Sequence, residues 1–196
     1  MKWLHVAVLF VFLNVLWLLG TLLGGVVFSL IPSTIAILKV LQLPRIFDND
    51  YSCREIIGSY YRFFKEAYKH NKVFLFLPIM IATIAVLELQ MITQNVFLQA
   101  TFQIPLTILL VYVVIIIFHV SYLATQLELI TSKQYKLLLL SPLIFNRSTI
   151  LILVVIMTLT IIALVKGWIL MVFFSLVIYA ASQLVGHDYK SKGLIR

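Results

Sequence analysis

The residues best suited to chemistry lie in one apolar stretch, at 104–127. His119, Tyr122 and Gln126 follow one another at helical spacing, so they share a face of a helix, and Glu128 follows the stretch. Polar and ionisable groups at membrane depth are costly and usually point inward or toward water. The sequence therefore predicts a polar face on this helix, turned toward a neighbouring helix or a water-filled space.

His119 is the residue on which that face depends. It has no second histidine or carboxylate within one turn on its own face, whereas proton relays use chains of such groups. We expect a hydrogen bond to a neighbouring helix, through a partner such as Asn14 or Thr21, with proton relay or ligand binding as the alternative. Glu128 lies near enough to Lys133 to pair with it.

Motifs for enzymatic chemistry are absent from the sequence. It contains no HExxH, no GxSxG, no phosphate-binding Walker loop and no repeated metal-ligand spacing. Cys53 is the single cysteine, so the chain forms no internal disulfide. We therefore expect a protein that is not an enzyme and has no catalytic, cofactor-binding or metal-binding residues.

The composition is that of an integral membrane protein. Hydrophobic residues make up 63% of the chain and charged residues 11%, against about 45–50% and about 25% in soluble domains. A helix of about 20 apolar residues crosses the hydrocarbon layer. The net charge of +8 comes from cations beside apolar stretches, which favours lipid headgroups rather than nucleic acid as partners. The sequence predicts a single all-α domain over 1–196, a polytopic membrane helical bundle.

The apolar stretches predict five membrane spans. They lie at about 5–30, 73–92, 104–127, 148–165 and 168–185. The first exceeds a signal-peptide core and no A-x-A-like cleavage site follows it, so we expect a retained span. Pro32 is expected to end it, before a short interfacial helix at 33–43. The alternative is a hairpin of two spans turning near Gly24 and Gly25, which makes six.

Charge indicates the orientation. Thirteen of the fifteen lysines and arginines lie at 39–72, at 128–147 or in the C-terminal tail. Because cytoplasmic loops are rich in lysine and arginine, these segments and the C-terminus are expected to be cytoplasmic. Five spans then place the N-terminus outside, and six place it inside. The charge count does not separate the two.

The segment at 52–72 is predicted to be a cytoplasmic amphipathic helix. Ser52 and Glu55 fit a capping box at its start. The helix has an aromatic and a basic face, and we expect it either to lie on the inner leaflet or to dock a partner. The candidate docking residues are aromatic or basic: Tyr61, Arg62, Phe64, Lys65 and Lys69. A second interfacial helix is expected at about 132–146, where Pro142 argues against a full span.

Small and polar residues in the first stretch predict helix packing. Gly20 and Gly24 form a GxxxG spacing, which lets another helix approach closely, within the chain or between subunits. Asn14 is expected to hydrogen-bond across helices, and Pro32 marks the break. A homo-oligomer is left open by this pattern.

Three short segments carry a resemblance to a known family. The segments Asn14–Leu19 (NVLWLL), Ile31–Ala36 (IPSTIA) and Tyr61–Lys69 (YRFFKEAYK) resemble the YesL-like family of bacterial membrane proteins, domain of unknown function 624. The resemblance implies a small membrane protein of Gram-positive bacteria with no assigned catalytic residues. Because members are commonly encoded beside importers for oligosaccharides, it also implies an accessory role in carbohydrate uptake.

The expected function follows from the membrane-protein composition together with the family resemblance. We expect a non-enzymatic accessory or regulatory subunit in the cell membrane, associated with the permease subunits of an ABC-type carbohydrate importer. A core importer permease is less favoured, because Glu66-Ala67-Tyr68 is not followed by the glycine of the ATPase-docking motif. The alternative function is an independent small transporter or channel that uses the polar face around His119.

Overall fold

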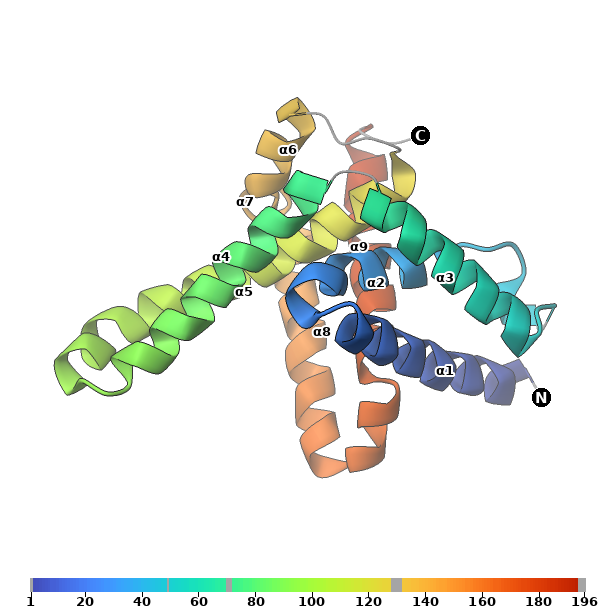
Figure 1. Ribbon diagram of the computed structural model, residues 1–196, viewed down its shortest axis with the longest axis horizontal. Helices are drawn as coiled ribbons and strands as arrows, with labels where there is room; N and C mark the ends of the chain where they lie inside the picture. The colour runs from blue at the N-terminus through green and yellow to red at the C-terminus, as the bar shows by residue number, and fades with distance from the viewer. Residues whose placement is uncertain (1, 49, 70–71, 128–131, 194–196) are drawn as a thin grey trace.

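The computed structural model describes residues 2–48, 50–69, 72–127 and 132–193, and every regular element in those ranges is a helix. Figure 1 shows how these helices are arranged. In chain order they are α1 (Lys2–Leu23), α2 (Val26–Leu41), η1 (Ile46–Asp48), α3 (Cys53–Lys69), α4 (Lys72–Ile92), α5 (Val96–Gln126), α6 (Ser132–Leu139), α7 (Ser141–Ile144), α8 (Asn146–Val165), η2 (Gly167–Met171) and α9 (Phe173–Ser191). The all-α prediction is confirmed.

The first apolar stretch is broken at Gly24–Gly25 rather than at Pro32. Gly25 has a φ of 74°, a left-handed conformation that costs glycine little and most other residues more. Pro32 instead lies inside α2, which continues through it to Leu41. The prediction of one helix over 5–30 ending at Pro32 was therefore wrong. That prediction assumed that proline ends a helix. Packed membrane helices tolerate proline when neighbouring groups bond to the backbone carbonyl that it leaves without a partner.

Helix α2 lies at the centre of the bundle. Its buried residues point in all directions around the helix and include Ile31, Ile35 and Val40. Helices α1, α3, α4, α5 and α9 all contact it. The prediction of an interfacial helix at 33–43 was wrong, because a helix that is apolar all round is buried rather than laid on a surface.

Helices α1 and α2 run antiparallel. Near the turn, the Trp17 indole N–H donates to the Thr34 hydroxyl at 3.1 Å. Toward the other end, the Phe10 ring stacks on Phe47 of η1, with ring centroids 6.4 Å apart. The N-terminal half of α1 therefore lies beside the basic segment that follows α2. This is the hairpin arrangement of the six-span alternative.

Two further hairpins, α4–α5 and the pair of α8 with α9, project from the central region in different directions (Figure 1). Three of the described helices are long and apolar enough to cross a membrane: Trp3–Leu23, Val96–Gln126 and Asn146–Val165. Val26–Leu41 and Phe76–Ile92 are shorter apolar helices. Many large apolar side chains on the projecting hairpins are exposed, among them Ile104, Met157 and Leu164. The protein is a membrane protein, because lipid is the solvent that such surfaces suit.

Some predicted boundaries differ from those in the structure. Helix α5 begins at Val96, within the segment expected to be a loop, because Asn95 caps it by accepting from the backbone N–H of Phe97 at 3.0 Å. The stretch predicted as a span at 168–185 starts as the 3₁₀ helix η2, and α9 follows from Phe173. The helix expected at 132–146 is two helices, α6 and α7, because Pro142 opens a new helix.

Candidate functional site

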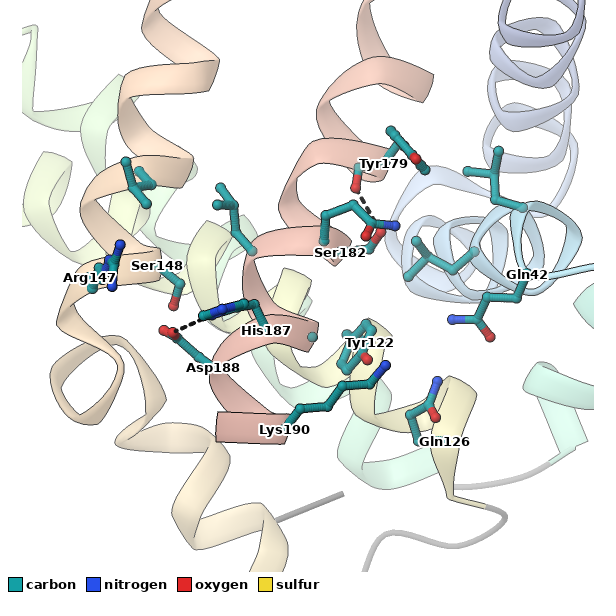
Figure 2. Close-up of a pocket in the computed structure, with 16 residues that line it drawn as sticks. Gln42, Tyr122, Gln126, Arg147, Ser148, Tyr179, Ser182, His187, Asp188 and Lys190 are labelled. Carbon is teal, nitrogen blue, oxygen red and sulfur yellow. Dashed lines mark hydrogen bonds and ion pairs between the residues drawn. The ribbon is translucent and has the colours of Figure 1, made fainter. Parts of the chain in front are cut away.

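A cleft of about 750 Å³ lies where the C-terminal ends of α2, α5 and α9 meet the N-terminal end of α8 (Figure 2). Most of the residues that line it are polar, and the others are leucines such as Leu41 and Leu151, together with Gly186. The polar lining residues are Gln42, Tyr122, Gln126, Arg147, Ser148, Tyr179, Ser182, Gln183, His187, Asp188 and Lys190. Residues from four helices therefore build one polar recess at an end of the bundle.

The inner part of the cleft is formed by buried residues. Tyr122 is 7% exposed, and its hydroxyl has no hydrogen-bond partner among the described residues. It is in close contact with α9, since a Cβ at Gly186 would lie 2.6 Å from that hydroxyl. Ser148 is also buried, and its own hydroxyl donates to the Phe145 carbonyl at 3.0 Å. The tyrosine hydroxyl is thus available to a molecule in the cleft.

The outer part of the cleft carries the charge. Arg147, His187 and Lys190 are exposed there, whereas Asp188 is half-buried. His187 Nδ1 lies 3.9 Å from the Asp188 carboxylate. Arg147 and Lys190 form no ion pair with a described residue. Cations therefore outnumber the single carboxylate at the mouth, which favours an anion there.

The structure separates the polar residues that the sequence placed on one face of α5. Tyr122 and Gln126 line the cleft, but His119 does not. Glu128 lies outside the described residues, so its expected pairing with Lys133 is not addressed by the structure.

His119 lies in an aromatic stack. It is fully buried, stacked on the Phe145 ring at 5.5 Å and tilted against the Tyr189 ring at 5.9 Å. Neither ring nitrogen has a hydrogen-bond partner in the described part of the chain. The expected bond to Asn14 or Thr21 was wrong, because the imidazole is held by ring contacts.

Asn14 bonds to the other end of the chain. Its side-chain oxygen accepts from the backbone N–H groups of Phe174 at 3.1 Å and Ser175 at 3.4 Å, in the first turn of α9. Its amide nitrogen donates to the Leu170 carbonyl at 3.1 Å. Asn14 thereby satisfies N–H groups at the start of α9 that have no partner within that helix, as an N-cap does, although it belongs to α1.

The small residues of α1 serve packing within the chain. A Cβ at Gly20 would overlap the Tyr60 hydroxyl of α3 and lie 2.8 Å from the Ser33 hydroxyl of α2. A Cβ at Gly24 would lie 2.5 Å from the Ser29 Cβ. Burial raises the pKa of Tyr60, and the Ser33 hydroxyl partly offsets that rise. The GxxxG spacing thus brings α1 against α2 and α3.

Helix α3 buries one face against α2 and exposes another. Ile56, Tyr60 and Ala67 are buried, and Lys39 of α2 pairs with Glu66 at 3.5 Å. Of the candidate docking residues, four are exposed and Phe64 is half-buried. The exposed four are Tyr61, Arg62, Lys65 and Lys69.

The outer surface of α3 combines apolar and basic groups. Tyr61 is 65% exposed and Ile57 46% exposed. The Arg62 guanidinium lies 4.9 Å from the centroid of the Phe63 ring and makes a cation–π contact with it. We call the set Ile57, Tyr61, Arg62, Lys65 and Lys69 the α3 outer face.

The start of α3 is capped as the sequence predicts. The Ser52 backbone N–H and hydroxyl donate to the Glu55 carboxylate at 2.7 and 2.8 Å, and the Glu55 N–H donates to the Ser52 hydroxyl at 3.4 Å. These bonds lower the pKa of Glu55 below its ordinary value of 4.5. A shallow groove of about 280 Å³ lies beside this cap, lined in part by Gly58 and Arg62.

Metal ligation has no candidate in the described part of the chain, where no group of three or more His, Cys, Asp or Glu side chains is placed to hold an ion.

The packing of α1 through α4 coincides with a match to a known family. Residues 10–89 match the model of the family described as "Protein of unknown function, DUF624". We call residues 10–89, which this family model matches, the DUF624 segment. No curated protein and no solved structure matches the chain. The resemblance noted in the sequence is confirmed over these residues.

The DUF624 segment contains the bonds that join the first two resembling segments. Trp17 donates to Thr34, and the Trp17 ring also stacks on Phe174 at 4.5 Å. Asn14 and Trp17 thus both connect the DUF624 segment to α9, which lies outside it. The cleft also joins the DUF624 segment to the rest of the chain. Gln42 belongs to the segment, whereas most of the other residues that line the cleft lie outside it.

Sequence reasoning did not find most of the cleft. The sequence analysis used Arg147 and Lys190 only as cytoplasmic cations, and it did not single out Gln42 or Asp188. One signal was present: Tyr179, Gln183, Gly186 and Lys190 recur at spacings of four, three and four, which places them on one helix face. That pattern predicts a polar or small face on the last helix, continuing beyond the expected end at 185.

Proposed function

We propose that this chain is a non-enzymatic accessory or regulatory subunit in the cell membrane of a Gram-positive bacterium, with its C-terminus in the cytoplasm. The partner we propose is a permease subunit of an ABC-type carbohydrate importer, in keeping with the family resemblance. The observation that carries the proposal is the α3 outer face, which combines a 65% exposed tyrosine with three exposed cations.

The chemistry of the α3 outer face supports docking. Interface energy concentrates in a few aromatic and arginine residues, and Tyr61 and Arg62 are adjacent on this face. Arg62 is already positioned on Phe63, so less conformational entropy is lost when it binds. Lys65 and Lys69 form no ion pair with a described residue, which leaves them available for acidic groups of a partner.

The test compares single charge reversals on the same side of the membrane. Tagged wild-type protein is purified from native membranes in gentle detergent, and importer permeases are quantified by mass spectrometry. We expect Arg62→Glu to remove most of the permease signal, while Lys136→Glu, at an exposed lysine on α6, leaves it unchanged. Equal recovery with both variants contradicts docking through α3. Loss of binding to anionic vesicles alone supports a helix that lies on lipid.

The alternative of an independent transporter has less support from the geometry. A transport path needs polar groups along the depth of the membrane. Tyr122 and Gln126 lie together in the cleft at one end of α5, and His119 is enclosed by aromatic rings.

A further inference from the structure

We propose that the cleft between α2, α5, α8 and α9 binds a phosphate ester that carries free hydroxyl groups, at the cytoplasmic boundary of the membrane. Two sources share this chemistry: the headgroup of an anionic phospholipid such as phosphatidylglycerol, and a soluble sugar phosphate. The inference is separate from docking through the α3 outer face and does not depend on it.

The size of the cleft suits such a ligand. Sites for small molecules commonly measure about 300–1,000 Å³, and this one measures about 750 Å³. It is larger than a bare inorganic anion needs. Its position at the ends of α5 and α8, two helices long enough to cross a membrane, places it where a lipid headgroup and a soluble metabolite can both enter.

The cations specify phosphate. Arg147 on α8 and Lys190 on α9 lie at the mouth of the same cleft, with His187 between them in Figure 2. Neither Arg147 nor Lys190 is neutralised by a described carboxylate. An arginine offers a planar pair of donors that matches two phosphate oxygens, and a lysine adds a point charge. A neutral sugar makes no use of two such cations.

The remaining groups specify hydroxyls on the same molecule. The half-buried Asp188 carboxylate accepts hydrogen bonds, so it disfavours a bare phosphate and suits a hydroxyl donor. The Tyr122 hydroxyl, on a side chain 93% buried, faces the cleft with no described partner and can both donate and accept. Gln126 adds an amide with the same versatility.

The experiment uses the full chain with three single substitutions and one control. Arg147→Gln and Lys190→Gln each remove one exposed cation, and Tyr122→Phe removes only a hydroxyl. Lys166→Gln is the control, because it removes the same charge at the C-terminal cap of α8, whereas the cleft lies at the N-terminal end of that helix. Gel filtration and circular dichroism first confirm that each variant is folded.

One arm tests lipid. Native mass spectrometry counts the phosphatidylglycerol and phosphatidylcholine molecules retained by protein from mixed vesicles. We expect phosphatidylglycerol retention to fall about tenfold for each cation removed, because a charge-assisted hydrogen bond to the phosphate is lost, and to fall with Tyr122→Phe. Lys166→Gln and phosphatidylcholine retention should not change. This result assigns the cleft to a lipid headgroup.

The other arm tests a soluble ligand. Glucose 6-phosphate is added to delipidated protein, with glucose and inorganic phosphate as comparisons, and the melting temperature is measured. If only glucose 6-phosphate stabilises the wild type and the Lys166→Gln control, and the three cleft variants lose this stabilisation, the ligand is a sugar phosphate. If neither arm separates the cleft variants from the control, the proposal is wrong. Tyr122→Phe keeps the test decisive if a charge variant fails to fold.

Discussion

Gly20 of α1 and Tyr60 of α3 lie so close that one methyl group at position 20 would overlap the Tyr60 hydroxyl. Ser33 of α2 borders the same point. Three helices therefore meet where the α1 side chain is absent. Because this contact is within the chain, the GxxxG spacing is already used and is not available at Gly20 for a second copy of the protein.

The first prediction concerns this contact. Gly20→Ala should lower the free energy of unfolding by about 1–3 kcal/mol, the usual cost of overpacking. Gly58→Ala is the matched control, since its Cβ would meet no atom within 4 Å. That change should stabilise α3 by about 0.5–1 kcal/mol through the backbone. Thermal unfolding in detergent measures both. Equal stability of the two variants would show that α1 does not approach α3 in this way.

Asn14 provides the second prediction. Asn14→Leu removes three hydrogen bonds to η2 and α9. At about 0.6 kcal/mol for each bond between membrane helices, the protein should lose about 2 kcal/mol of stability. Val15→Leu, at a position 46% exposed, is the control and should have little effect. The readout is the melting temperature together with protease cleavage near η2. A stable, protease-resistant Asn14→Leu protein would contradict the cap.

His119 provides the third. Because its ring is held between Phe145 and Tyr189 without a described hydrogen bond, His119→Phe should keep the stability within about 1.5 kcal/mol of wild type. His119→Ala should lower it by about 3 kcal/mol, since a cavity is left. Chemical denaturation compares the two. A greater loss with phenylalanine than with alanine would indicate that the ring nitrogens have polar partners.

A structural feature of this protein is predictable from the sequence when the residues that form it are close together along the chain. The bonds between Ser52 and Glu55 are predictable because the capping box is formed within four residues. The break at Gly25 and the continuation through Pro32 are not, because both residues disturb helices and tertiary packing decides which one does. The cleft is harder still, since Gln42, Tyr122 and Asp188 meet only after four helices have packed.

The fourth prediction concerns pH. The pKa of Glu55 is lowered in the folded protein by the bonds from Ser52. Because this pKa is lowered on folding, the cap stabilises the start of α3 fully at a pH above the pKa of Glu55 in the unfolded chain. This stabilisation is lost as the pH falls through the pKa of Glu55 in the folded protein. Amide exchange at Ser52, corrected for the intrinsic rate, should therefore lose protection as the pH drops below 4.5. Glu55→Gln should show lower protection throughout and no such transition. An unchanged transition in that variant would assign it to another group.

The fifth prediction concerns topology. Because α1 and α2 are antiparallel, the N-terminal half of α1 and the basic segment before α3 lie at the same end of the bundle. Cys53 is free and exposed. A membrane-impermeant thiol reagent should label neither Cys53 nor a cysteine fused before Lys2 in intact cells, and both after permeabilisation. Lys166→Cys in a Cys53→Ser background should label in intact cells. An accessible N-terminal cysteine would restore the five-span orientation.

The bond from Asn14 to Phe174 has a consequence for the order of biosynthesis. The two residues are 160 positions apart, so at about 5–20 residues per second a ribosome makes the second roughly 8 to 32 s after the first. During that interval α1 is already synthesised, while its amide has none of the three groups that it finally binds. Helix α1 therefore cannot complete its hydrogen bonds until η2 and α9 have been synthesised. Until α9 is synthesised, the nascent chain has an asparagine without hydrogen-bond partners in an apolar helix. At this stage the Asn14 amide is exposed to binding by a membrane chaperone or by a subunit that assembles early.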